Sequence, residues 1–217
     1  MTNRCIILLG GSFDPVHYGH VEVATFFCRL LRTDELRIIP AGSPWQKERL
    51  QASSEQRIDM IRIAFSNASL SPKIDRQEID RPGATYTVDT LRTLRRELGN
   101  DVSLALVIGA DQMARFDTWR EWRHLFDYAH ICVAARPGFS FFESKLPQAV
   151  AEEFSRRCGL PEQIRTTPHG LTYLAHELAF DISATEIRAT LRLGQRPSSL
   201  VPAEVIDYIE KNNIYKE

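Results

Sequence analysis

Short apolar segments alternate with segments of helical periodicity along most of the chain. Runs of apolar and β-branched residues predict buried strands at 5–9, 36–39, 74–79, 104–108, 131–135 and 171–175. Apolar residues at helical spacing predict helices at 19–31, 53–65, 86–98, 183–193 and 202–211. Strands separated by helical crossovers pair in parallel, with helices on both faces of the sheet. The pattern therefore predicts an α/β fold with a doubly wound parallel sheet, a single domain over 1–217 and a helical C-terminal part.

One region departs from this alternation. Residues 137–169 lack a clear strand and contain one amphipathic stretch, 145–157. We interpret 137–169 as an insertion within the domain.

Composition restricts the classes of partner. The 217 residues carry a formal net charge of −1, so no global basic field attracts nucleic acid, and any phosphate-binding charge must be local. No apolar run approaches the roughly 20 residues of a membrane span. The four cysteines form no Cys-x-x-Cys pair, which favours a reducing compartment. We therefore expect a soluble cytoplasmic protein with neither a nucleic acid nor a membrane as partner.

The segment 10–20 follows the first predicted strand and opens the first predicted helix. A helix start at the carboxyl end of a strand offers N–H donors and positive potential to an anion, and Gly10 and Gly11 let the backbone approach it closely. His17 and His20 are three residues apart, on one face of the first helical turn, with the small Gly19 between them. An ordinary strand-to-helix turn is the plain alternative. The concentration of glycines and histidines at a phosphate-binding position favours a polyphosphate site.

A second candidate segment opens the helix at 183–193. Ser183 is a good N-cap, and Arg188 lies within the first turns, where its guanidinium reaches phosphates gathered at that end. A capped helix with a solvated arginine is an equally simple interpretation of this segment alone. Together with the segment 10–20, it indicates a phosphate site more strongly than it does alone.

Together the two segments resemble the signatures of the HxGH nucleotidyltransferases. The pattern Gly-x-Phe-Asp-Pro-x-His-x-Gly-His is met at every fixed position, by Gly11, Phe13, Asp14, Pro15, His17, Gly19 and His20. The second pattern, Ser-x-Thr-x-x-Arg, is met by Ser183, Thr185 and Arg188. Over nearly the whole chain the sequence is similar to the bacterial nicotinate-nucleotide adenylyltransferases. The resemblance implies a Rossmann-like sheet and transfer of AMP from ATP, with Mg²⁺, to nicotinate mononucleotide.

The resemblance also assigns site residues. It implies catalytic roles for His17, His20, Lys47 and Arg188. It implies ATP contacts for Gly10, Gly11, Ser12, Phe13, Gly19, Ile108, Gly109, Asp111, Ser183 and Thr185. It implies acceptor contacts for Thr85, Tyr86, Thr87, Trp119 and Arg136, with the acceptor carboxylate at the helix start near 85–87 and the pyridine ring on Trp119. No dedicated protein metal site is expected, so the metal arrives with ATP.

Some positions have competing interpretations. Lys47 keeps the basic position of the family's Pro-Pro-His-Lys/Arg segment, but Trp45 and Gln46 replace Pro and His. Thr85 is equally well explained as part of an ordinary helix cap. Trp119 and Trp122 are three apart and could both be core residues; we expect a site role for Trp119 and a core role for Trp122.

Other functions remain open from the sequence. The same chemistry could act on nicotinamide mononucleotide or on phosphopantetheine, although the length disfavours the shorter phosphopantetheine enzymes. A nucleotide-binding sensor without turnover is a second alternative, against which the intact histidines and basic residues argue. An RNA-binding protein is a third, against which the net charge argues. We expect a monomer or a small homo-oligomer.

Overall fold

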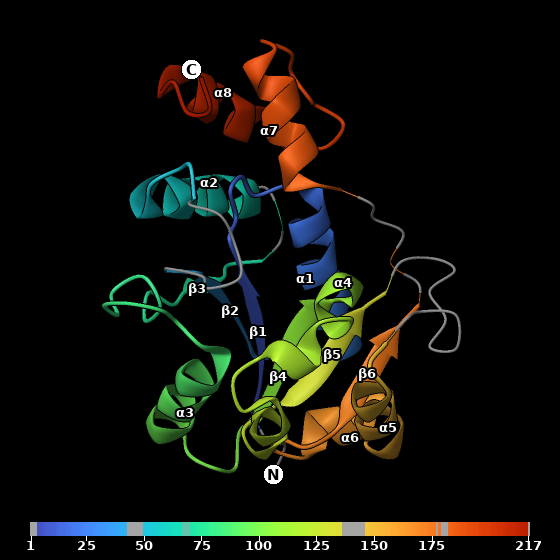
Figure 1. The fold of residues 1–217 in the computed structure, drawn as a ribbon. Coiled ribbons are helices and arrows are strands. Elements are labelled where there is room, and N and C mark those ends of the chain that lie inside the picture. Colours follow the sequence, from blue (N-terminus) through green and yellow to red (C-terminus); the bar gives the residue numbers. More distant parts are fainter. Residues whose placement is uncertain are drawn as a thin grey trace.

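The computed structural model describes residues 4–42, 50–66, 68, 70–135, 146–176, 178 and 182–216. Six parallel strands form one sheet in the order β3-β2-β1-β4-β5-β6 (Figure 1). The strands are β1 (Cys5–Gly11), β2 (Glu35–Pro40), β3 (Lys73–Ile74), β4 (Ser103–Gly109), β5 (His130–Ala134) and β6 (Thr172–Ala175). This is the strand order of a Rossmann-like doubly wound sheet, so the predicted fold class is confirmed.

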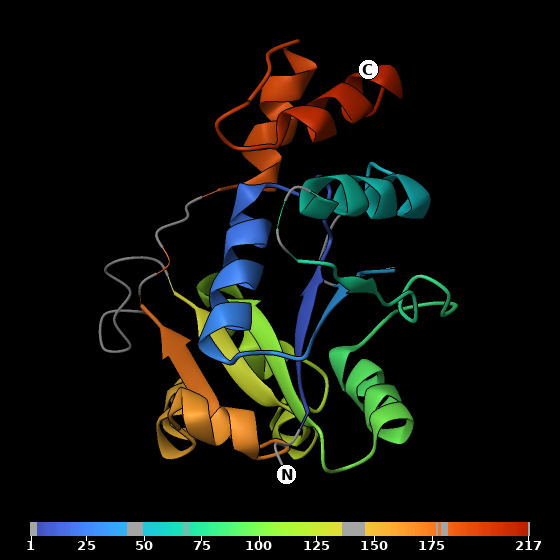
Figure 2. The same cartoon turned by 180° about the vertical axis from the view of Figure 1, so that it is seen from behind.

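Helices cover both faces of the sheet, as Figures 1 and 2 show from opposite sides. One face is covered by α1 (Tyr18–Leu30) and α2 (Ser54–Ser66), and α7 (Ala184–Arg192) and α8 (Ala203–Lys211) lie beyond these helices, past the carboxyl ends of the strands. The other is covered by α3 (Thr87–Leu98), α4 (Ala110–Met113), the 3₁₀ turns η1 (Phe116–Thr118) and η2 (Trp122–Asp127), and α5 (Gln148–Arg156). The short helix α6 (Pro161–Thr166) precedes β6.

Alternate residues of the central strand supply two cores. Cys5, Ile7 and Leu9 of β1 pack in the core under α1 and α2. Ile6 and Leu8 pack in the core under α3. The pleat sends successive side chains to opposite faces, which explains why a strand buried on both sides is apolar throughout. Trp122 is buried in the second core, as expected.

The strand expected at 74–79 is much shorter than predicted, because β3 ends at Ile74. The side chain of Asp75 accepts a hydrogen bond from the backbone N–H of Gln77 at 3.0 Å and starts a turn. Such a local bond offers the backbone an alternative to the strand ladder. The prediction of a strand over 75–79 was therefore wrong.

Residues 146–169 lie in the segment interpreted as an insertion. They contain α5 and α6 and form part of the connection between β5 and β6. The amphipathic stretch at 145–157 corresponds to α5, whose Val150 and Phe154 are buried.

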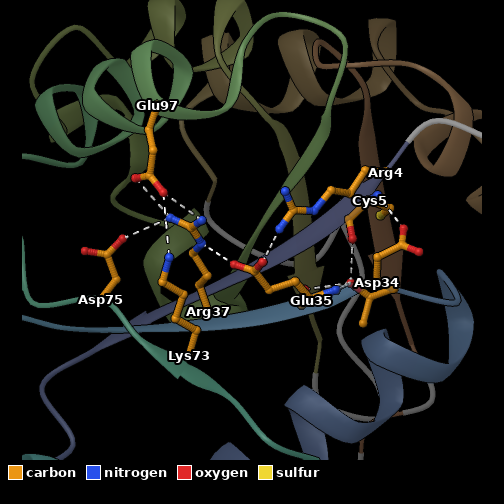
Figure 3. A network of polar contacts seen from close by, with 9 residues as sticks. Arg4, Cys5, Asp34, Glu35, Arg37, Lys73, Asp75 and Glu97 are labelled. Carbon is orange, nitrogen blue, oxygen red and sulfur yellow. Dashed lines mark hydrogen bonds and ion pairs between the residues drawn. The ribbon is translucent and has the colours of Figure 1, made fainter.

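An ion network around the buried Arg37 fastens α3 to the edge of the sheet (Figure 3). Arg37 of β2 is only 2% exposed, and its guanidinium meets Glu97 of α3 at 2.9 Å and Asp75 at 3.5 Å. Glu35 also pairs with Arg37, and Lys73 lies 3.7 Å from Glu97. A buried guanidinium is costly without partners, and Glu97, the partner on α3, fixes this helix against β2.

No helix in the described ranges is long and apolar enough to cross a bilayer.

Candidate active site

A cavity of about 770 Å³ opens at the carboxyl ends of β1 and β4, where the strand order reverses. Gly10 and Gly11 end β1, and Ile108 and Gly109 end β4, and all four line the cavity. Ligands of open α/β sheets bind at such a switch point. The structure thus brings the first signature segment to the place where the sequence predicted a phosphate site.

The two signature histidines stand at the start of α1. His17 is its N-cap and is 8% exposed, and the ring of His20 stacks on it at 3.8 Å between centroids. The backbone N–H of His17 donates to Nδ1 of His20 at 3.2 Å. Nδ1 of His20 is therefore an acceptor, so the proton of a neutral ring sits on Nε2. Both rings line the cavity.

Small and aromatic residues of the same segment hold these rings in place. A Cβ on Gly19 would lie 3.1 Å from Nδ1 of His17, so glycine leaves room for that ring. Phe13 is fully buried, and its ring packs 4.7 Å from that of His20. Phe13 was expected to contact ATP, but its side chain lies under His20 and does not line the cavity.

The second signature segment lies beside the first in the cavity wall. Ser183 is the N-cap of α7 and, with Thr185 and Arg188, lines the cavity. Arg188 donates through Nη1 to the carbonyl of Asp14 at 2.7 Å and through Nη2 to Oγ1 of Thr185 at 3.3 Å. The two segments, distant in sequence, are therefore joined directly by this guanidinium.

The start of α3 forms another part of the wall. Tyr86 is the N-cap of α3, its side chain makes no capping hydrogen bond to this helix, and Thr85 and Thr87 line the cavity. A helix start favours an anion. Tyr86 does not line the cavity. The guanidinium carbon of Arg120 lies over the Tyr86 ring, 4.9 Å from its centroid.

An aromatic residue and an acid flank this helix start. Trp119 lines the cavity, and its Nε1 is buried and finds no hydrogen-bond partner among the described residues. Glu78 also lines the cavity and accepts a hydrogen bond from Thr90 at 2.8 Å; burial raises the pKa of its carboxyl. A Cβ on Gly42 would lie 2.0 Å from the carbonyl oxygen of Glu78, so only glycine permits this approach.

Gly109 makes room for Asp111 at the end of β4. A Cβ on Gly109 would lie 2.5 Å from Oδ1 of Asp111. Asp111 is exposed, lines the cavity and accepts a hydrogen bond from Gln112 at 2.8 Å. An exposed carboxylate next to a glycine can accept hydrogen bonds from the hydroxyl groups of a ligand.

Two predicted residues, Lys47 and Arg136, lie outside the described residues, as do Trp45 and Gln46. Their assigned roles stay predictions.

Besides Glu78, the structure adds two polar residues that the sequence did not single out. Arg57 of α2 is 1% exposed and donates to the carbonyls of Ser12 at 2.8 Å and Ala41 at 2.7 Å, which joins the loops after β1 and β2. Burial lowers the pKa of this guanidinium. Tyr215 donates to the carboxylate of Asp14 at 2.6 Å. An arginine on the apolar face of the helix predicted at 53–65 was the only signal for Arg57, and no local pattern identified Tyr215.

Comparisons with known proteins agree with this geometry. The cytidylyltransferase-like family model matches residues 8–190. A protein of Herminiimonas arsenicoxydans, named "Probable nicotinate-nucleotide adenylyltransferase", is 60% identical over 99% of this chain and 98% of its own length. One of the same name from Dechloromonas aromatica is 40% identical over 96% of each chain.

A solved structure supports the fold independently. The Plasmodium falciparum nicotinic acid mononucleotide adenylyltransferase complexed with NaAD superimposes with a TM-score of 0.72 over 98% of each chain, at 22% identity. The chain therefore belongs to the cytidylyltransferase-like family and, within it, to the nicotinate-nucleotide adenylyltransferases.

Proposed function

We propose that this chain transfers the AMP group of ATP to the phosphate of nicotinate mononucleotide, giving nicotinate adenine dinucleotide and pyrophosphate, a step of NAD biosynthesis. One observation carries the proposal. A single cavity at the switch point is lined by both signature segments, by the start of α3 and by Trp119. The starts of α1 and α7 offer hydrogen-bond donors to phosphates. Trp119 offers an aromatic face to the pyridine ring, and the start of α3 offers N–H donors to its carboxylate.

ATP occupies the part of the cavity next to α1 and α7. The backbone at Gly10, Gly11, Ser12 and Phe13 lies along the phosphates, and Gly19 leaves room for them. Ser183, Thr185 and Arg188 hold the β- and γ-phosphates, because the start of α7 and the guanidinium supply donors and positive charge there. Ile108, Gly109 and Asp111 take the nucleoside, with the Asp111 carboxylate accepting from the ribose hydroxyls.

The acceptor occupies the part next to α3. The N–H groups at the start of α3, in the segment Thr85, Tyr86 and Thr87, receive the pyridine carboxylate, and the ring stacks on Trp119. Because the ring of Tyr86 packs against Arg120, Tyr86 contributes to binding of the carboxylate through its backbone N–H. Arg136 supplies a further cation to the acceptor.

The reaction is an in-line displacement at phosphorus. An oxygen of the acceptor phosphate forms a bond to the ATP α-phosphorus as the bond to the bridging α–β oxygen breaks, and pyrophosphate leaves with that electron pair. The acceptor phosphate is anionic near pH 7, because its second pKa is about 6, so no general base is needed. Catalysis is then positioning and charge stabilisation. His20 donates from Nε2 to the α-phosphate with His17 beside it, and Lys47 and Arg188 neutralise the leaving pyrophosphate.

Nucleotidyltransferases of this family use a divalent metal together with ATP. Asp14 offers little to a metal, since its carboxylate oxygens accept hydrogen bonds from Gln51, Ala52 and Tyr215. No group of three or more metal-ligating side chains occurs within the described ranges. We propose that Mg²⁺ enters with ATP, where it would supply charge neutralisation to the phosphates.

Positional labelling of ATP tests the proposal. With nicotinate mononucleotide as acceptor, label in the α-phosphate should appear in the dinucleotide, and label in the γ-phosphate should appear in pyrophosphate. Label from the γ-phosphate in the acceptor product, or release of inorganic phosphate alone, would show a different transfer. A chain that binds ATP but turns over neither nicotinate mononucleotide nor nicotinamide mononucleotide would instead be a sensor.

A further inference from the structure

The segment after α8 reaches the first signature loop through Tyr215. Its hydroxyl donates to Oδ1 of Asp14 at 2.6 Å, across 201 positions of sequence. Both residues are buried, with Tyr215 7% and Asp14 3% exposed. A buried charge-assisted hydrogen bond of this length is stronger than a neutral one. The contact therefore holds the end of the chain against the loop that follows β1.

Further hydrogen bonds of Asp14 connect this contact to residues that line the cavity. Its carboxylate also accepts from the backbone N–H groups of Gln51 at 2.8 Å and Ala52 at 3.1 Å, just before α2. Its carbonyl oxygen accepts from Nη1 of Arg188 at 2.7 Å. The side chain of Asp14 thus fixes the residue whose carbonyl orients the signature arginine.

The backbone at Tyr215 gives independent support. Its φ is 66°, a left-handed conformation that aromatic residues rarely adopt. Such conformations persist where surrounding contacts over-determine them, and they concentrate at functional sites. The neighbouring Ile214 is 5% exposed in the core under α8. Burial raises the pKa of the Tyr215 phenol, so the hydroxyl remains a donor near neutral pH.

We propose that Tyr215 is a positioning residue for adenylyl transfer: through Asp14 it holds the guanidinium of Arg188 in the orientation that meets the ATP phosphates. The inference rests on the proposed function in one respect, the role of Arg188 toward ATP. A purely structural tyrosine would affect stability alone. A positioning tyrosine affects turnover beyond its effect on stability, since a displacement of about 1 Å at a reacting group costs as much as 100-fold in rate.

The chain supplies a matched control in Tyr208 of α8. Its hydroxyl donates to Oδ2 of Asp59 in α2 at 2.9 Å, which is also a tyrosine–aspartate bond from the C-terminal part. Neither Tyr208 nor Asp59 lines the cavity. Tyr208→Phe removes one hydroxyl of the same kind without touching Asp14 or Arg188.

The experiment compares Tyr215→Phe and Tyr208→Phe with the wild type. The midpoint of urea unfolding reports stability, and pyrophosphate release reports kcat and the KM values for ATP and nicotinate mononucleotide. We expect both variants to unfold at lower urea, and only Tyr215→Phe to lose about tenfold or more in kcat with an unchanged KM for the acceptor. A kcat of Tyr215→Phe within about twofold of Tyr208→Phe would overturn the inference, because the hydroxyl would then act on stability alone.

Failure of the proposed function would be seen separately. If the wild type released no pyrophosphate with either pyridine nucleotide, the inference would be tested by ATP binding with isothermal titration calorimetry. A weaker ATP affinity in Tyr215→Phe than in Tyr208→Phe would support it. Equal affinities would overturn it.

Discussion

Arg57 is a buried guanidinium that holds the loops after β1 and β2 together at the rim of the cavity. Its two donors to the carbonyls of Ser12 and Ala41 are 2.8 and 2.7 Å long. We predict that Arg57→Met, which keeps most of the apolar stem of the side chain and removes both bonds, lowers kcat by about 10- to 100-fold, because both loops line the cavity.

The effect on stability follows from the two lost bonds. A hydrogen bond from a charged donor contributes about 1.5–3 kcal/mol net of desolvation, so the two bonds together contribute about 3–6 kcal/mol. Burial lowers the pKa of Arg57, because desolvation disfavours its charged form. We therefore expect a loss of about 3–6 kcal/mol in the free energy of unfolding, measured by urea denaturation.

Arg95 of α3 provides the control for this prediction. It is 7% exposed and donates to the carbonyls of Gly99, Val102, Tyr128 and Pro168, close to the amino ends of β4, β5 and β6. Burial lowers its pKa to about 10. Arg95→Met should destabilise the fold at least as much as Arg57→Met and leave kcat unchanged. Equal kcat values for the two variants, measured well below their unfolding midpoints, would refute the claim that Arg57 positions the cavity loops.

Three further predictions concern the site and the core. His20→Ala should lower kcat by about 10²–10³-fold with an unchanged unfolding midpoint, and retention of more than about a tenth of wild-type turnover would count against a role at the α-phosphate. Trp119→Ala should raise the KM for nicotinate mononucleotide about tenfold while the KM for ATP stays constant, since an aromatic pair contributes about 0.5–1.5 kcal/mol beyond its buried area. An unchanged KM for the acceptor would show that the pyridine ring does not stack on Trp119. Burial lowers the pKa of His130 to about 4 from 6.5, so the stability that its neutral form contributes is fully present above about pH 6.5 and is lost as the pH falls toward 4. The loss should reach about 3 kcal/mol in urea titrations at each pH, and His130→Gln should flatten this dependence; an equally steep curve in the variant would exclude His130 as its source.

The sequence predicts those parts of the fold that depend on local pattern. Continuous apolar runs predicted β1, β4 and β5 because these strands are buried on both faces. Ser53 and Gln56 form a capping box before α2, with mutual bonds of 2.8 and 3.2 Å, and this sequence pattern marks the start of the helix predicted at 53–65. The short helix α6 was missed because its six residues are too few for a periodic signal, although Pro161 at its start is a typical first helical residue.

The site could be predicted where its residues are close in sequence. His17 and His20 occupy one helical turn, so their stacking follows from spacing. The contact of Arg188 with Asp14 spans 174 positions and that of Tyr215 spans 201, and no periodicity encodes such pairs. Glu78 was assigned to a strand, and its place in the cavity wall depends on the turn that begins at Asp75.

Acceptor selectivity tests most directly whether this chain transfers AMP to nicotinate mononucleotide and binds the acceptor carboxylate at the start of α3. Pyrophosphate release would be measured with ATP and Mg²⁺, with nicotinate mononucleotide and nicotinamide mononucleotide as parallel acceptors. We expect rapid release with the acid and little with the amide, because the start of α3 favours a carboxylate. Equal rates with the two acceptors would contradict it, since the start of α3 would then not select the acid.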